Sequence, residues 1–162
     1  MKFEANRGTA TERVASVLPK EPEVTDPELS VHDVLSRELR DWMTAELRYP
    51  VLAIITPSGA PNQSVMWFDL DREDHDTILM NTRVGRAKER WLRDDPRVSL
   101  LFEDGLVWYA MQGTIEFDDD RERALADIKA LARRYDSNPE KFNGQERATL
   151  RMKVEKVIAH DR

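Results

Sequence analysis

Residues 82–93 read Thr-Arg-Val-Gly-Arg-Ala-Lys-Glu-Arg-Trp-Leu-Arg, with five basic side chains and one acidic side chain in a chain of formal net charge −6. A strand is predicted to end at Thr82, Gly85 permits a tight turn, and a helix is predicted to begin near Arg86. The backbone N–H groups at the start of that helix then point at one spot. The segment therefore predicts a phosphate site made by Thr82, Arg86 and Lys88.

A solvated helix face is the alternative interpretation of the same basic residues. Arginines spaced by four and three residues pair readily with nearby acids. The residues concerned are Arg86, Arg90 and Arg93, with Glu89, Asp94 and Asp95 as partners. The position of the cluster directly after a strand-ending threonine and a glycine favours the phosphate interpretation.

The segments on either side predict a mainly antiparallel β fold. Apolar runs separated by turn residues predict six strands, over residues 51–56, 64–70, 77–82, 98–102, 107–117 and 148–158. The fifth strand is long enough to bend at Gly113. Apolar residues at helical spacing predict helices from Ser30 to Tyr49-Pro50, over 86–93 and over 119–135, with Ser30 and Asp118 as N-caps.

The order of these elements does not alternate regularly between strand and helix. It therefore favours an antiparallel barrel over a doubly wound parallel sheet. The chain of 162 residues is in the single-domain range. We divide it into a mobile N-terminal arm over residues 1–29, which mixes prolines and acids without an apolar period, and one domain over residues 30–162.

Composition excludes several functional classes. The chain has no cysteine, which excludes disulfides, thiolate metal sites, iron–sulfur clusters and a cysteine nucleophile. Its net negative charge argues against general binding of nucleic acid. No stretch approaches the roughly 20 apolar residues of a membrane span, and the N-terminus lacks the apolar core of a secretion signal. We expect a cytoplasmic protein that binds neither nucleic acid nor membrane.

Two groups of residues are weak candidates for a metal site. The three histidines are scattered and are interpreted as surface residues: His32, His75 and His160. Five acids crowd the loop after the predicted second strand: Asp69, Asp71, Glu73, Asp74 and Asp76. A divalent-ion site is the alternative there, but the spacing is not that of an EF-hand, and we prefer a solvated hairpin tip. We expect no metal site.

Further motifs surround the basic segment in a definite order. They are Gly59-Ala60-Pro61, Val65-Met66-Trp67-Phe68, Gly85-Arg86-Ala87-Lys88, then Leu92 to Leu100 and Gly113 to Asp119. This pattern, over roughly residues 35–158, resembles the pyridoxamine-phosphate-oxidase-like split-barrel superfamily. More narrowly, it resembles the B-type flavin/deazaflavin-dependent oxidoreductases.

The resemblance implies a fold and a site. The fold is mainly β (α+β), a six-stranded antiparallel split β-barrel with flanking helices, assembled as a homodimer with cofactor sites between subunits. The implied cofactor-binding residues are Ser64, Val65, Met66, Trp67, Met80, Asn81, Thr82, Arg86 and Lys88. No catalytic residue is identified.

The resemblance also implies a redox activity. Pyridoxamine-phosphate oxidases carry FMN, with an Arg on the second strand and a Ser before the Arg-Lys pair, and this chain departs from both features. Trp67 and the Gly-Arg-x-Lys motif resemble the branch that uses the deazaflavin coenzyme F420, whose tail bears a phosphate and several glutamates. The implied reaction is hydride transfer between coenzyme F420 and an unsaturated small-molecule substrate. Additional positive charge at Arg83, Arg90 and Arg93 suits such a polyanion.

Alternatives remain open at this stage. One is an FMN-dependent oxidoreductase of the pyridoxamine-phosphate-oxidase type, and another is a non-catalytic flavin- or haem-binding split barrel. Four aromatic residues are candidates for a planar substrate pocket, and ordinary core or interface positions explain them equally well: Trp42, Trp67, Trp108 and Tyr109.

Overall fold

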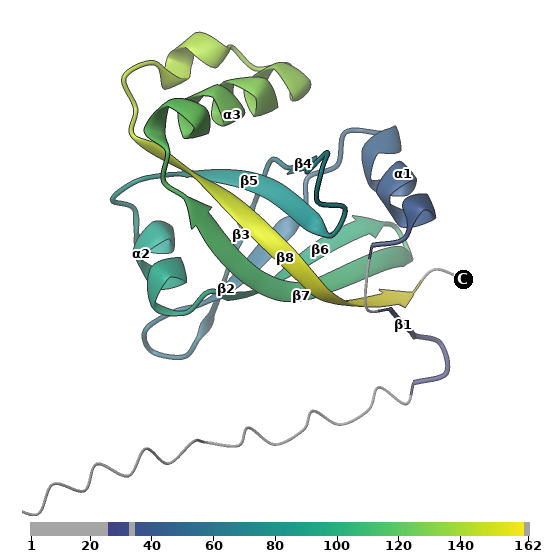
Figure 1. The fold of residues 1–162 in the computed structure, drawn as a ribbon. Helices are drawn as coiled ribbons and strands as arrows, with labels where there is room; N and C mark the ends of the chain where they lie inside the picture. The colour runs from purple at the N-terminus through teal and green to yellow at the C-terminus, as the bar shows by residue number, and fades with distance from the viewer. Residues whose placement is uncertain (1–25, 33–34, 161–162) are drawn as a thin grey trace, which may run out of the picture.

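The computed structural model describes residues 26–32 and 35–160 (Figure 1). Within this part, eight strands form one antiparallel sheet in the order β3-β2-β6-β7-β8-β5-β4, and β1 pairs with β8. The strands are β1 (Ser30–His32), β2 (Val51–Ile55), β3 (Pro61–Val65), β4 (Asp69–Leu70), β5 (Thr77–Arg83), β6 (Arg97–Asp104), β7 (Val107–Asp118) and β8 (Arg147–His160). Across the described residues no ladder joins β3 to β4, so the barrel stays open, as the split-barrel prediction requires.

The strand count differs from the six strands that we predicted. One strand was expected over residues 64–70, but β3 ends at Val65 and β4 begins at Asp69. Backbone groups between them bind outside the sheet ladder. The Met66 N–H donates to the Pro50 carbonyl at 2.9 Å, and the Phe68 N–H donates to the Tyr135 hydroxyl at 3.3 Å. The other additional strand is β1, where a helix was expected.

The first helix begins later than predicted. The expected N-cap, Ser30, lies in β1 and pairs with Ala159 of β8. Helix α1 spans Arg37–Ala45, and its N-cap is Ser36, whose side chain accepts a hydrogen bond from the Leu39 N–H at 3.1 Å. The prediction chose the wrong serine because two serines precede the apolar pattern, and only the later one is free of the sheet ladder.

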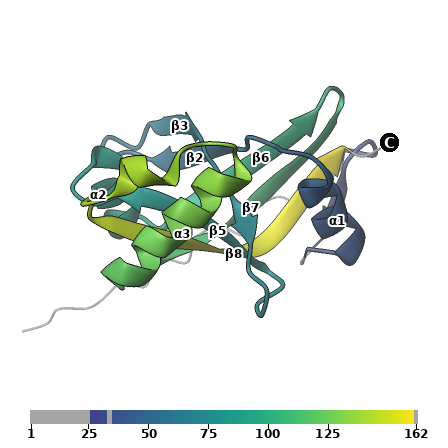
Figure 2. The same ribbon diagram turned by 90° about the horizontal axis from the view of Figure 1, so that it is seen from above.

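Two further helices cover the sheet. Helix α2 spans Ala87–Asp94 and contacts β2 and β5, whereas α3 (Arg121–Arg134) lies across β5 and β8 (Figure 2). The predicted cap of α3 was Asp118, but Asp118 ends β7. The N-cap is Asp120, which accepts the Arg123 N–H at 2.9 Å. A short 3₁₀ helix, η1 (Pro139–Phe142), follows α3 within the predicted polar loop.

The core lies inside the curved sheet and under α1 and α3. Phe68 and Phe102 meet edge to face at 4.8 Å between ring centroids, and both are essentially fully buried. The long strand β7 carries a register shift between Gln112 and Gly113. A Cβ atom at Gly113 would lie 1.9 Å from the Lys153 carbonyl oxygen, so only glycine fits this irregularity.

No helix among residues 26–32 and 35–160 is long and apolar enough to cross a membrane. Most of the predicted N-terminal arm, residues 1–25, lies outside the described residues. The end of that segment, residues 26–29, leads through a turn into β1.

Candidate cofactor site

A cavity of about 490 Å³ opens between β5, the start of α2, α3, the η1–β8 segment and the residues that follow β3. Five of its lining residues are basic, and among the described residues none that lines it is acidic. The lining consists of Val65, Met66, Trp67, Asn81, Thr82, Arg83, Arg86, Lys88, Ile128, Leu131, Lys141, Phe142, Gln145 and Arg147.

Seven of the nine predicted cofactor-binding residues lie together on this cavity: Val65, Met66, Trp67, Asn81, Thr82, Arg86 and Lys88. Ser64 and Met80 do not line it. Met80 is fully buried in the hydrophobic core. The Ser64 hydroxyl lies 3.8 Å from the Met66 sulfur, and alternation along β3 turns Ser64 away from Val65.

The turn between β5 and α2 is shaped by Gly85, whose φ of +83° is a left-handed conformation that glycine adopts freely. Its N–H donates to Glu89 Oε2 at 3.3 Å, and its carbonyl accepts from Arg90 Nη1 at 2.7 Å. Arg93 pairs with Glu89 and, at 2.6 Å, with Asp119. These contacts hold α2 against the turn and against the end of β7.

Each of the two interpretations of residues 82–93 therefore accounts for part of the segment. Arg90 and Arg93 bind groups of the protein, as a solvated helix face would. Arg83, Arg86 and Lys88 line the cavity, as a phosphate site requires. Three of the five basic residues in the segment thus remain for a ligand.

Lys88 is half-buried, and its ammonium nitrogen lies 3.0 Å from the Met66 sulfur. Thioether sulfur is a weak acceptor, so this contact compensates little for lost water. Burial lowers the pKa of Lys88, and the charge of the neighbouring Arg86 lowers it further. An anionic ligand would reverse both effects by supplying an opposite charge.

The sequence interpretation missed the part of the cavity that η1 and the start of β8 supply: Lys141, Phe142, Gln145 and Arg147. Arg147 Nε donates to Asn81 Oδ1 at 2.7 Å, and its Nη1 donates to Gln145 Oε1 at 3.0 Å. Burial, with the charges of Arg86 and Arg83, lowers the pKa of Arg147 to about 10. No local pattern signalled it, because Arg147 begins an alternating strand in which polar residues usually face solvent.

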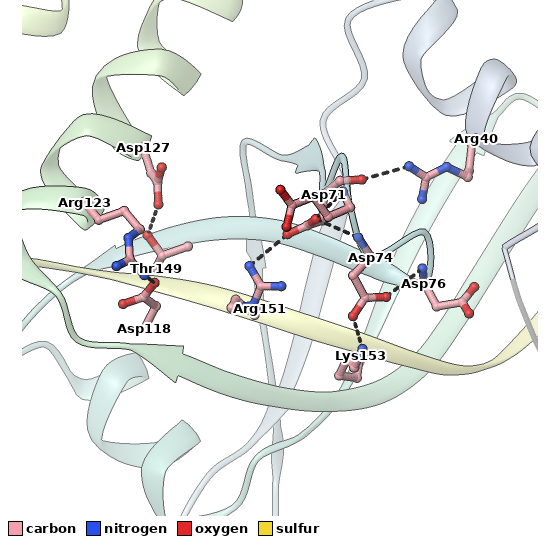
Figure 3. Close-up of polar contacts among 11 residues, drawn as sticks. Arg40, Asp71, Asp74, Asp76, Asp118, Arg123, Asp127, Thr149, Arg151 and Lys153 are labelled. Carbon is pink, nitrogen blue, oxygen red and sulfur yellow. Dashed lines mark hydrogen bonds and ion pairs between the residues drawn. The ribbon is translucent and has the colours of Figure 1, made fainter.

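Asn81 is held by neighbouring elements. Its side-chain nitrogen donates to the Ala124 carbonyl of α3 at 2.9 Å and lies 3.4 Å from the Thr149 hydroxyl. That hydroxyl donates in turn to Asp127 Oδ2 at 2.6 Å, a contact drawn in Figure 3. These bonds leave the Asn81 side-chain oxygen directed at Arg147.

The apolar side of the cavity centres on Trp67. Its ring stacks on Tyr135 at 5.3 Å with an interplanar angle of 11°, and Phe142 meets it edge-on at 6.3 Å. The Tyr135 hydroxyl donates to the Arg48 carbonyl at 2.7 Å, which fixes the ring that supports Trp67. Of the four aromatic candidates only Trp67 lines the cavity. Trp42 packs on Tyr109, and Trp108 stacks on His160.

Two acids of the loop between β4 and β5 pair with basic residues of β8 (Figure 3). Asp71 accepts the Glu73 and Asp74 N–H groups at 2.8 and 2.9 Å and pairs with Arg151 at 2.8 Å. Asp74 pairs with Lys153. The Asp74 N–H is the main reason that the pKa of Asp71 is lowered. In the part of the chain that the structure describes, no group of three or more potential ligands is placed to hold a metal ion.

His75 and His160 lie away from the cavity lining. His160 Nδ1 is 2.8 Å from the Leu106 carbonyl oxygen, and His75 is exposed in the β4–β5 loop. The side chain of His32 lies outside the described residues.

The chain thus folds as an open antiparallel split barrel with a basic cavity at its edge. The family model for pyridoxamine 5'-phosphate oxidase matches residues 35–161, which is most of the chain. The chain therefore belongs to the pyridoxamine 5'-phosphate oxidase family. This confirms the resemblance to the split-barrel superfamily that the sequence motifs indicated.

Solved structures are similar in fold. An F420 reductase is 21% identical with a TM-score of 0.62, and the match covers 72% of this chain and 94% of that one. A conserved hypothetical protein from Mycobacterium tuberculosis is 26% identical with a TM-score of 0.63, over 77% and 84% of the two chains. An FMN-binding protein from Nostoc punctiforme, related to pyridoxamine 5'-phosphate oxidase, is 16% identical with a TM-score of 0.53, over 73% and 77%. No curated protein matches the chain.

Proposed function

We propose that this protein is a coenzyme F420-dependent oxidoreductase, which transfers a hydride between the deazaflavin and an unsaturated organic substrate. The observation that carries the proposal is the cavity itself, in which five basic residues and a stacked tryptophan meet and which, within the described residues, no acidic side chain lines. Such a lining suits a ligand with a planar ring at one end and several negative charges at the other.

The residues of the cavity fit this coenzyme in two parts. Arg86 and Lys88 would hold the phosphate, with the buried hydroxyl of Thr82 beside them. Met66 and Trp67 would lie against the ring system, since Trp67 is already supported from behind by Tyr135. The binding residues thus come from two separate segments of the chain, residues 66–67 and 82–88.

When bound, the deazaflavin supplies the hydride chemistry. The protein binds and orients the coenzyme and shields the ring from water. The described lining residues include no carboxylate or histidine, but the ammonium groups of Lys88 and Lys141 can exchange protons. We propose that the proton reaches the substrate from solvent or from a nearby group of this kind.

FMN is the second candidate cofactor. The family to which the chain belongs is named for an FMN enzyme activity, and the similar protein from Nostoc punctiforme is FMN-binding. FMN also has a planar ring and a phosphate, so Arg86, Lys88 and Trp67 would serve it in the same way. It uses less of the positive charge in the cavity, and we therefore rank it second.

We also propose that two copies of the chain complete the site. Val65 lines the cavity and is 64% exposed, and Tyr49 and Leu101 add apolar surface that is exposed in one copy. A second copy packed on this surface would bury these residues and cover the open side of the cavity. Light scattering should give twice the mass of the chain, and a monomer would contradict this proposal. The cytoplasmic location stays a prediction.

A side-by-side titration tests the proposed function. Purified protein is titrated with coenzyme F420, followed by the change in its fluorescence, and with FMN, followed by flavin absorbance. We expect tighter binding of coenzyme F420, and reduction of an unsaturated acceptor only when reduced coenzyme is supplied. Binding of FMN alone would transfer the assignment to the second candidate. A Soret band with added haem and no flavin binding would contradict both.

A further inference from the structure

We infer that Arg83 and Arg147 form a second oxyanion subsite, beside the Arg86 and Lys88 phosphate site, which takes a carboxylate or second phosphate of the ligand. The inference rests on the proposed function, because both subsites lie in the same cavity. It adds that the ligand carries two separate acidic groups.

The two arginines are neighbours across the sheet. In the β5–β8 ladder Arg83 is the Cα partner of Arg147, so the two side chains leave the same face of adjacent strands. Like charges directly opposite one another in an antiparallel pair are destabilising. An anion placed between the two guanidinium groups removes that repulsion and receives hydrogen bonds from both.

Arg147 is held in place without being neutralised. Its two hydrogen-bond partners, Asn81 and Gln145, are uncharged amides. Among the residues that the structure describes, no carboxylate forms an ion pair with it, and its lowered pKa reflects burial beside Arg86 and Arg83. A half-buried guanidinium that keeps donors toward a cavity is arranged to bind an anion from outside the protein.

Two described acidic residues in the neighbourhood of Arg147 have other partners. Glu146, beside Arg147 in sequence, pairs with Arg121 at 2.7 Å. Asp127 accepts the Thr149 hydroxyl at 2.6 Å (Figure 3), and that hydroxyl lies 3.4 Å from the Asn81 side-chain nitrogen. The positive charge at Arg83 and Arg147 is therefore left to a ligand.

The charge of a single phosphate does not balance the cavity. At neutral pH a phosphate carries about one negative charge as a diester, the form in coenzyme F420, and roughly two as a monoester, the form in FMN. Five basic residues line the cavity, so about three or four positive charges remain. A second acidic group balances more of them. For the proposed coenzyme its source is the glutamate tail, and for FMN its source is an acidic substrate.

The test compares ligands that differ only in the second acidic group. Wild type, Arg83→Gln and Arg147→Gln are titrated with coenzyme F420 bearing its glutamates and with the form that lacks them. Arg37→Gln is the matched control, since it removes the same charge from an exposed ion pair outside the cavity and leaves Glu146 paired with Arg121. Arg83 is exposed, so its variant stays informative where Arg147→Gln fails to fold.

We expect each subsite variant to bind the glutamate-bearing coenzyme roughly tenfold more weakly, the scale of one charge-assisted hydrogen bond. Binding of the form without glutamates should change less than about twofold, and Arg37→Gln should match wild type. Equal losses of affinity for both coenzyme forms would assign Arg83 and Arg147 to the phosphate site and overturn the inference. No loss of affinity for either form would also overturn it. A rise confined to the KM of an acidic substrate would support the subsite with the substrate as the source.

A second measurement separates this inference from the proposed function. If wild type binds neither coenzyme form nor FMN, the proposed function fails, and the subsite is tested with inorganic anions. Pyrophosphate should then raise the Tm of wild type more than orthophosphate does, because it spans both subsites. Loss of that difference in Arg83→Gln and Arg147→Gln, but not in Arg37→Gln, would support the subsite. If the Tm difference between pyrophosphate and orthophosphate persisted in Arg83→Gln and Arg147→Gln, the inference would be wrong.

Discussion

Strand β8 contributes basic residues to two charge clusters that differ in how they are neutralised. Near its middle, Arg151 and Lys153 pair with Asp71 and Asp74 of the β4–β5 loop. At its start, Arg147 joins the cavity, whose lining is basic without an acidic residue from the described part of the chain. The first cluster is neutralised by the protein itself, and the second is not.

The difference separates structural charge from charge that serves a ligand. In the loop, opposite charges and backbone N–H groups stabilise each carboxylate, so the cluster contributes to folding. In the cavity, desolvation and mutual repulsion lower the pKa of Lys88 and of Arg147, so the cluster opposes folding until an anion binds. Substitutions in the two clusters should therefore change different properties.

The largest expected effect is on ligand binding by the cavity cluster. Arg86→Ala or Lys88→Ala should weaken cofactor binding by about 1.5–3 kcal/mol, the scale of a hydrogen bond to a charged group. The free energy of unfolding should stay the same or rise slightly, because repulsion is relieved. Titration of each variant with coenzyme F420 and with FMN measures the loss.

Arg90→Ala is the control for this prediction, because Arg90 belongs to the same helix but binds the Gly85 carbonyl. It should keep most of the affinity for the cofactor. Wild-type affinity in both the Arg86 and Lys88 variants would remove the assignment of the phosphate site.

A smaller effect, on folding alone, is expected in the loop. Asp71→Asn should lower the free energy of unfolding by about 1–2 kcal/mol, because the side chain loses its charged bonds to two N–H groups and to Arg151. The lowered pKa of Asp71 agrees with this expectation, because it means that the folded state stabilises the charged carboxylate. Its stabilising contribution is present above the ordinary pKa of aspartate and is lost as the pH falls through the lowered value.

Urea unfolding at neutral pH and at about pH 3 measures this difference. The variant should lose less stability than wild type on acidification. Cofactor affinity should not change, and a large loss of affinity in Asp71→Asn would mean that the two clusters are not independent.

The smallest effect is the pH dependence of cofactor binding. The lowered pKa of Lys88 means that it loses its proton at a lower pH than a free lysine. The protonated form binds the anion, so affinity should begin to fall at a lower pH than the ordinary pKa of lysine would give. Lys88→Arg should show a flatter profile, because a guanidinium stays protonated to higher pH. Parallel profiles for the two proteins would show that Lys88 does not contact the anion.

Much of the fold follows from local sequence. Apolar runs between turn residues marked most of the sheet, and Gly113 marked the irregularity of β7, because strand formation and turn geometry depend on neighbouring residues. The errors lie where distant residues compete for a backbone group. Ser30 was expected to cap a helix, but its backbone pairs with Ala159. The expected strand at residues 64–70 is interrupted where Tyr135 accepts the Phe68 N–H.

For the site, sequence alone marked the Thr82–Lys88 segment and Trp67, because a strand end, a glycine and a basic helix start are contiguous and the family motif covers them. Only the tertiary structure decided which basic residues face the cavity. Arg93 is turned to Glu89 and Asp119, whereas Arg147 is brought beside Arg83 by the β5–β8 ladder. Pairing of strands far apart in the chain sets these neighbours, and no local pattern records it.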